Sequence, residues 1–175
     1  MAVFWAIASG RKVRARWGER VVVFLSTFEK QLDAKRRIVV PQEFRAAASS
    51  GPFEGIMCFP SFEADCLEGG GQALFNRYEA LIEELPFGDP LRTSIEFSVR
   101  GGLSRMSFDS AGRITLPETL CEQFNLTDWV VVVGLGERFQ IWEREAFRVY
   151  REAQRLAARA GLAEHRAQQR AAKVA

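Results

Sequence analysis

Histidine and paired cysteines are nearly missing from this chain of 175 residues. The single histidine is His165, close to the C-terminal end, so histidine-based catalytic triads and zinc sites have no donor elsewhere. The three cysteines, Cys58, Cys66 and Cys121, contain no C-x-x-C pair, which argues against a disulfide framework and suits a reducing cytosol. The composition therefore removes the usual parts of most enzymes, and we expect neither enzyme activity nor a metal or cofactor.

Long apolar runs are missing as well. No segment approaches the ~20 apolar residues that a membrane helix needs, so we expect no membrane partner. The short apolar run at residues 2–8 precedes the basic residues, which is the reverse of a signal peptide. We interpret residues 1–22 as an N-terminal extension outside the fold, either a basic leader or the product of a misplaced translation start. A basic arm that grips DNA is the alternative.

The formal net charge is only +2, but it is unevenly distributed. Residues 1–21 and residues 143–175 each carry a net charge of +4, whereas residues 22–142 hold eleven basic and seventeen acidic side chains. An acidic body with basic ends is not typical of a protein that binds nucleic acid over its whole surface. Any DNA binding by the body must therefore come from a local basic cluster.

The most informative feature is an internal repeat. The segment LDAKRRIVVP at residues 32–41 returns as FDSAGRITLP at residues 108–117, with Asp, Arg, Ile and Pro at the same spacing. Each copy predicts a turn begun by Asp, a strand of β-branched residues and a helix that starts at the proline. The two copies indicate two equivalent halves around a pseudo-two-fold axis. The expected helices are 42–48 and 118–124, and the expected later strands are 55–60, 129–133 and 139–142.

Helices are also expected between and after the two copies. Apolar residues fall on one helical stripe over residues 74–85, and Asp89 begins a second helix that runs to about Val99. The Gly69–Gly71 run lacks the Lys and Ser/Thr of a phosphate-binding loop, so we interpret it as a flexible connector. From Glu143 onward the chain predicts a long helix whose first half docks on the core or on a neighbouring subunit.

The repeated turns carry cations that can bind phosphate or the O6/N7 edge of guanine. A turn gains nothing structurally from Lys35 and Arg36, which makes them the stronger binding candidates. Arg45 lies just beyond the first copy and Arg100 precedes the second, but neither joins the candidate set. The DNA-binding candidates are Lys30, Lys35, Arg36, Arg37, Arg105 and Arg113.

Three residues are expected to fix the turns. Asp33 and Asp109 are spaced to pair across their turns with Arg37 and Arg113, and Gly112 can supply a positive φ. Pairing with Asp and binding to DNA are compatible roles for the two arginines.

The alternatives from enzyme chemistry are weaker. Glu83 and Glu84 are adjacent on a helix and diverge, so they indicate a solvated face rather than an acid–base pair. Cys66 and Cys121 have no histidine to activate them, and we expect them to be apolar filler.

The twin motif D-x-x-x-R-[IV]-x-x-P resembles that of the MraZ family of bacterial transcriptional regulators, which are built from two tandem AbrB-like modules. The resemblance runs from about Val23 to Trp142. It implies an α+β fold: a duplicated AbrB-like swapped-hairpin β-barrel with a helical insert and a C-terminal helix. The implied divisions are an extension (1–22), a first half (23–70), the insert (71–100), a second half (101–146) and a helical tail (147–175).

The resemblance also implies a function. Family members bind tandem repeats in the promoter of their own division and cell-wall gene cluster as ring-like homo-oligomers, so double-stranded DNA and further copies of this chain are the expected partners. The expected localisation is cytoplasmic and nucleoid-associated. By position, the DNA-facing residues are Lys35, Arg37 and Arg113. The family usually has glycine where this chain has Arg36, and an arginine there meets a steric cost at positive φ.

An oligomeric protein–protein scaffolding module is the alternative to a DNA-binding regulator. In that case the repeat only builds an oligomer, and the basic turns dock acidic partners without specific DNA readout. A preference for promoter repeats over scrambled DNA separates the two hypotheses.

Overall fold

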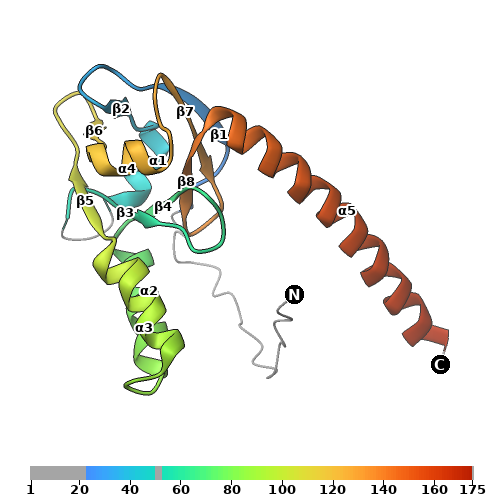
Figure 1. Ribbon diagram of the computed structural model, residues 1–175. Helices are drawn as coiled ribbons and strands as arrows, with labels where there is room; N and C mark the ends of the chain where they lie inside the picture. Colours follow the sequence, from blue (N-terminus) through green and yellow to red (C-terminus); the bar gives the residue numbers. More distant parts are fainter. Residues whose placement is uncertain (1–22, 50–52, 175) are drawn as a thin grey trace.

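The computed structural model describes residues 23–49 and 53–174 and shows an α+β architecture (Figure 1). The structure repeats one unit: a strand, a turn, a short strand, a short helix and two further strands. The first copy comprises β1 (Thr27–Gln31), β2 (Arg37–Val39), α1 (Gln42–Ala48), β3 (Gly55–Pro60) and β4 (Leu67–Gly70). The second copy comprises β5 (Ser104–Ser107), β6 (Arg113–Thr115), α4 (Glu118–Gln123), β7 (Trp129–Gly134) and β8 (Phe139–Glu143).

The two halves exchange their first strands. The larger sheet is antiparallel with the order β1-β7-β8-β4-β3-β5, so β1 of the first half pairs with β7 of the second and β5 pairs with β3. At the centre of the sheet β4 pairs with β8. The order is the same from either edge once the halves are interchanged, so a pseudo-two-fold axis passes between β4 and β8.

A second, two-stranded sheet formed by β2 and β6 lies over the core. Ile38 on β2 is opposite Ile114 on β6, and both side chains are buried beneath the strands. Phe44 of α1 is fully buried at the centre of the core. Its ring packs against three others, those of Phe24, Phe28 and Phe139, at centroid distances of 5.1–5.6 Å. The core thus fixes the position of the β2–β6 ribbon.

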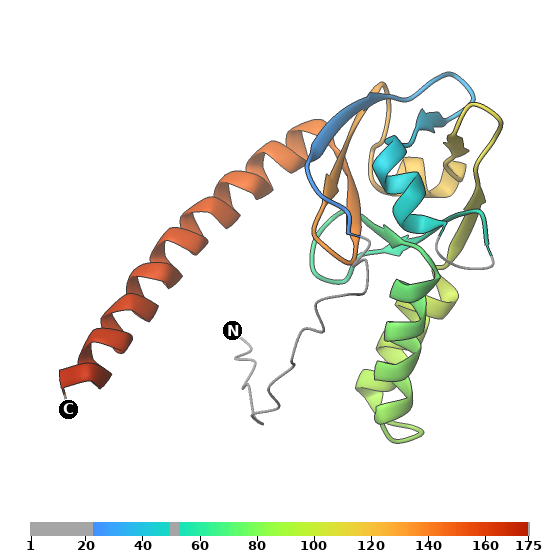
Figure 2. The ribbon, with the colours of Figure 1, turned by 180° about the vertical axis from the view of Figure 1, so that it is seen from behind.

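The helical insert protrudes from one end of the body (Figures 1 and 2). It contains α2 (Gln72–Glu84), α3 (Pro90–Glu96) and a π-helical turn, η1 (Phe97–Gly101). The predicted second helix therefore begins where expected, with Asp89 accepting a hydrogen bond from the Leu91 N–H at 2.7 Å, but its last turn is wound more loosely.

The prediction of a flexible connector at Gly69–Gly71 is wrong, because Gly69 and Gly70 belong to β4 and are buried. A Cβ on Gly69 would lie 2.5 Å from Sγ of Cys58 and 2.7 Å from the ring of Phe139, its neighbours on the two flanking strands. Glycine is required here because these side chains lean across its position.

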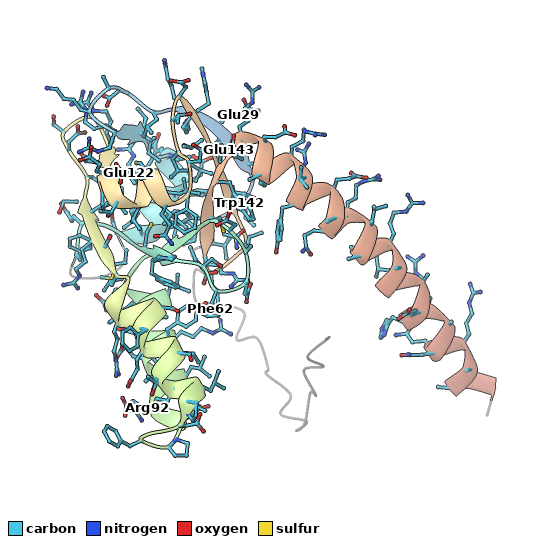
Figure 3. All side chains as sticks on the ribbon, in the orientation of Figure 1. Glu29, Phe62, Arg92, Glu122, Trp142 and Glu143 are labelled. Atoms are coloured by element: carbon cyan, nitrogen blue, oxygen red, sulfur yellow. The ribbon has the colours of Figure 1, made fainter. Side chains whose placement is uncertain are left out.

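The chain ends in a long helix, α5 (Arg144–Val174), that leaves the body and extends away from it (Figures 1 and 2). Phe147 and Tyr150 pack on Trp142, with ring centroids 6.2 and 4.6 Å apart, so only the first turns dock on the core (Figure 3). The side chains of residues 151–172 are exposed. No helix in the described part is both long and apolar enough to cross a membrane. The basic leader proposed for residues 1–22 lies outside the described residues.

Candidate nucleic-acid interface

The first turn is built around the carboxylate of Asp33. Its Oδ1 accepts hydrogen bonds from the backbone N–H groups of Lys35 and Arg37, both at 2.9 Å, and its Oδ2 accepts one from Nε of Arg37 at 2.8 Å. The hydrogen bond from the Arg37 side chain is the main reason that the pKa of Asp33 falls to about 2. The carboxylate therefore stays charged at neutral pH and holds the turn closed.

The second turn repeats this arrangement. The Asp109 carboxylate accepts from the backbone N–H groups of Ala111 and Arg113 at 2.9 Å and from Nε of Arg113 at 2.7 Å. The backbone hydrogen bond from Arg113 is the largest cause of a lowered pKa of Asp109. Arg36 (φ 57°) and Gly112 (φ 71°) occupy the same left-handed position in the two turns. An arginine thus fills a glycine position without changing the turn, at a cost of roughly 1–2 kcal/mol.

The β2–β6 ribbon places both motif arginines on one face. Arg37 lies opposite Thr115, and Arg113 lies opposite Val39. Residues opposite each other in an antiparallel pair point to the same side, so these four side chains share a face while the two isoleucines between them point into the core. Val39 is 47% exposed, which identifies this face as the outer one. Two residue steps separate the arginines along the ribbon, about 7 Å.

Both turns meet at one corner of the body, here called the turn corner (residues 33–37 and 109–113). Each left-handed residue accepts a backbone hydrogen bond from the opposite half. Leu116 N–H donates to Arg36 at 2.8 Å, and Val40 N–H donates to Gly112 at 3.1 Å. Figures 1 and 2 show the blue and yellow turn loops beside each other, away from the insert.

The cations of the turn corner are only partly neutralised. The hydrogen bond to Asp33 raises the pKa of Arg37, and the charge of Asp109 in the other turn contributes to the same shift. Lys35 is exposed, and within the described residues its ammonium group forms no ion pair. Arg113 uses only Nε to bind its aspartate in the described structure. Nη2 of Arg37 also lies 2.7 Å from Oδ2 of Asp33, so the donors available to a ligand are Nη1 of Arg37, the terminal nitrogens of Arg113 and the Lys35 ammonium group.

The other two DNA-binding candidates, Lys30 and Arg105, lie on strands, and each packs against an aromatic ring. Lys30 on β1 has its ammonium 5.5 Å from the ring centroid of Phe28, and Arg105 on β5 lies 5.3 Å from that of Phe53. They are not equivalent in the two halves, because the counterpart of Lys30 is the buried Met106. The repeat symmetry therefore does not bring Lys30 and Arg105 together with the turns.

Arginines of the insert are enclosed by carboxylates. Arg100, which precedes the second motif in sequence, points into the insert and binds three glutamates at 2.7–3.0 Å. Arg92 binds two glutamates at 3.0–3.1 Å and lies far from Glu122 on α4 (Figure 3). The glutamates are Glu79, Glu83 and Glu96. This network holds the insert together, and it explains why Arg100 is absent from the turn corner.

The cysteines are buried within the body. Burial raises the pKa of Cys66 to about 12, and it also raises the pKa values of Cys58 and Cys121. They therefore stay protonated at neutral pH, which fits apolar filler. No group of three or more potential metal ligands occurs among the residues that the structure describes.

One basic residue of this corner was not among the sequence candidates. The guanidinium of Arg45, on α1 of the first half, lies against Gly112 in the turn of the second half. Alignment of the two copies could have drawn attention to this residue, because the first copy has Arg45 at the helix position where the second copy has Cys121, 76 residues later.

A tandem α+β protein that presents two arginine-bearing turns of the same geometry on an exposed β-ribbon has the kind of surface with which β-ribbon proteins contact DNA. Comparison with known families agrees with this class. The family model for the MraZ protein, which is described as antitoxin-like, matches residues 23–98 and 101–170. The chain belongs to the MraZ family.

Curated relatives carry the same family name. The chain is 72% identical over 153 residues to the transcriptional regulator MraZ of Phenylobacterium zucineum, covering 87% of this chain and 95% of the relative. It is 71% identical over 153 residues to that of Caulobacter vibrioides, with 87% and 97% covered. A more distant relative, from Xanthobacter autotrophicus, is 35% identical over 127 residues, with 73% and 81% covered.

Proposed function

We propose that this chain is a DNA-binding transcriptional regulator that recognises tandem repeats in the promoter of its own division and cell-wall gene cluster through the turn corner. The observation that carries the proposal is the presence of Arg37 and Arg113 on one exposed face of a two-stranded ribbon. The major groove of B-DNA, about 12 Å wide, admits such a ribbon. The regulatory role also has support from the names of the curated relatives.

Within this proposal the side chains have distinct tasks. Arg37 and Arg113 contact phosphates or guanine edges with their terminal nitrogens, and Lys35 and Arg36 add phosphate contacts. Asp33 and Asp109 do not contact DNA; they hold the turns in shape. Lys30 on β1 and Arg105 on β5 contribute phosphate contacts at the edge of the interface.

A ring of several copies explains how an acidic body binds DNA. A single turn corner offers few cations, which supports only weak, non-specific affinity. Several corners on one rim make later contacts intramolecular, with gains on the order of 10²–10⁴. The proposal includes closure of the sheet into a barrel and a cytoplasmic, nucleoid-associated location.

An apolar groove supports contacts between copies and also favours the second candidate function, protein–protein scaffolding. The groove has a volume of about 1080 Å³ and lies between the insert and the β7–β8 turn. Several of its lining side chains are exposed: Phe62, Leu81, Leu91 and Leu135. Scaffolding alone predicts no preference among DNA sequences.

A fluorescence-anisotropy titration tests the proposal with DNA from upstream of the chain's own gene and with a scrambled duplex. We expect the wild type to prefer the upstream DNA. The variant Arg37→Ala/Arg113→Ala is expected to lose roughly 100-fold in affinity and about 1.8 in salt slope, because each phosphate contact contributes about 0.9. Equal binding of both duplexes, or an unchanged salt slope in the double variant, contradicts the proposal.

A further inference from the structure

Residues 34–36 of the first turn differ from residues 110–112 of the second, and at the last of these positions the difference is mirrored across the pseudo-two-fold axis. The left-handed residue is Arg36 in the first turn and Gly112 in the second. Each of these turn residues lies near a helix of the opposite half. The large Arg36 lies near the small Cys121 of α4, and the small Gly112 lies against the large Arg45 of α1. Each pair of equivalent positions is 76 residues apart.

In the second turn, the guanidinium of Arg45 takes the space that a side chain on Gly112 would need. A Cβ built on Gly112 would lie 2.6 Å from Cζ and 2.8 Å from Nε of Arg45. A side chain at position 112 would therefore require the Arg45 guanidinium to move from the place that it occupies beside the turn.

In the first turn, the side chain of Arg36 leaves from the equivalent Cβ and runs toward α4. Its Nη1 lies 3.7 Å from the Glu118 carboxylate. Glu118 and Cys121 are three residues apart on α4 and share one face of that helix, so the guanidinium lies at the face that carries the small residue. Burial raises the pKa of Cys121, and the charge of Arg36 partly offsets that rise. The side chain of Arg36 is 40% exposed, so it reaches the surface of the turn corner.

The two guanidinium groups also share an unusual environment. Among the described residues, the buried side-chain nitrogen and oxygen atoms without a hydrogen-bond partner are Nε of Arg36 and Nε of Arg45. A buried donor without an acceptor is unfavourable and rare. Its occurrence in these two arginines, and in no other residue of this set, indicates that packing holds the stems of both side chains in place beside the turns.

We infer that Arg36 and Arg45 supply the same cationic position, once to each turn, and that this position binds a phosphate of the DNA backbone. The first half provides the cation from its own turn, and the second half receives it from the helix of the first. With Arg45 included, each turn carries two arginines, Arg36 with Arg37 and Arg45 with Arg113. The phosphate contact rests on the proposed function, whereas the shared position rests on the structure.

Moving the cation between its two sources tests the inference. Arg36→Gly is expected to lower the salt slope of DNA binding by about 0.9 and the affinity roughly tenfold, because one phosphate contact is lost. Arg36→Gly/Cys121→Arg reproduces the Gly112–Arg45 arrangement in the first half, and we expect it to regain the slope. The matched control is Arg36→Gly/Cys121→Met, which fills the space without charge and should not regain it.

Arg45→Met gives the corresponding test in the second half. Its long apolar side chain still covers Gly112, so we expect an unchanged melting temperature and a slope lower by about 0.9. A wild-type slope in Arg45→Met, or equal slopes in the Arg and Met versions of the double variant, overturns the phosphate role. The proposed function fails separately, if Arg37→Ala/Arg113→Ala binds DNA as the wild type does.

A DNA-free measurement tests whether the position is shared. Cys121→Arg adds a second guanidinium beside Arg36, and we expect its melting temperature to fall by roughly 3 °C or more. In the Arg36→Gly background the same change should cost much less, since the space has been vacated. An equal decrease in both backgrounds shows that the two residues do not share a site. Because this measurement needs no DNA, it tests the shared position even if the wild type binds no DNA.

Discussion

Arginine has different surroundings in the turn corner and in the helical insert. In the insert, Arg100 is bound by three glutamates and Arg92 by two, so their charges are neutralised on the spot. In the turn corner, Arg37 and Arg113 each bind one aspartate, which also accepts two backbone N–H groups. The number of carboxylates that bind each arginine therefore distinguishes the insert, where arginine has a structural role, from the turn corner, where arginine can bind a ligand. The number of arginines does not make this distinction.

The same comparison explains how a body with excess acidic charge can present a basic face. The glutamates Glu79 and Glu83 form ion pairs with Arg100 within the insert, and the insert protrudes from the end of the body away from the turn corner (Figures 1 and 2). Since the Debye length is about 8 Å at physiological ionic strength, distant acidic side chains are screened from the turn corner. The sum over the sequence therefore understates the local positive charge.

Charge reversal gives the largest expected effect and the most direct way to break the comparison. Lys35→Glu should weaken DNA binding roughly 100-fold, because it removes one phosphate contact and adds a repulsive charge beside the duplex. Arg159→Glu is the matched control: it makes the same charge change on the exposed part of α5, which extends away from the body (Figure 1). Anisotropy titrations at constant salt compare the two. Equal losses would mean that net charge, not the turn corner, drives binding.

Removing a turn aspartate separates geometry from charge. Asp33→Ala deletes a negative charge near the duplex, so a purely electrostatic interface predicts tighter binding. We expect roughly tenfold weaker binding instead, because two backbone N–H groups lose their acceptor and the turn opens. Asp33→Asn keeps an acceptor oxygen for both groups and should bind as well as the wild type. Tighter binding by Asp33→Ala, measured in the same titrations, would exclude a turn-fixing role.

The insert should respond in the opposite way. Arg92 is only 13% exposed and joins Glu83, Glu96 and the carbonyl of Leu85, so Arg92→Ala removes a packed side chain and a hydrogen bond to the part-buried Leu85 carbonyl, while Arg100 still binds both glutamates. We expect its melting temperature to fall by roughly 3 °C, which corresponds to about 1 kcal/mol in a chain of this size. DNA affinity should not change. A loss of affinity without a change in melting temperature would place Arg92 in the binding surface.

The sequence predicts the repeated unit well because its signals are local. Asp begins each turn, β-branched residues form each short strand, and Pro starts each helix, so the residues that identify the unit lie within ten positions of one another. The exchange of β1 and β5 between the halves was expected only from the family resemblance. Strand pairing over such separations leaves no local signal.

The missed features have nonlocal causes. Strand β4 has the sequence LEGG, whose glycines disfavour a strand, and only the neighbouring side chains of Cys58 and Phe139 make them necessary. The contact of Arg45 with Gly112 joins two halves of the chain and is invisible within either motif. Aligning the two copies with each other reveals it, because positions 36 and 45 are both arginine in the first copy, whereas their counterparts 112 and 121 are both small.

Acid sensitivity gives the smallest expected effect. The pKa of Asp33 is lowered from 3.8 to about 2 in the folded chain, so its contribution to stability is present above about pH 4 and is lost as the pH falls toward 2. In the insert, hydrogen bonds from Arg100 lower the pKa of Glu79 in the same direction. Thermal melts at pH 5 and pH 2.5 should therefore show a smaller acid-induced decrease in melting temperature in Asp33→Asn than in the wild type, and likewise in Glu79→Gln.

Because the turn corner and the insert share no ion pair in the described structure, we expect the two reductions to add in the double variant. If the acid-induced decrease in melting temperature is the same in the double variant as in either single variant, the electrostatic contributions of the two regions are coupled.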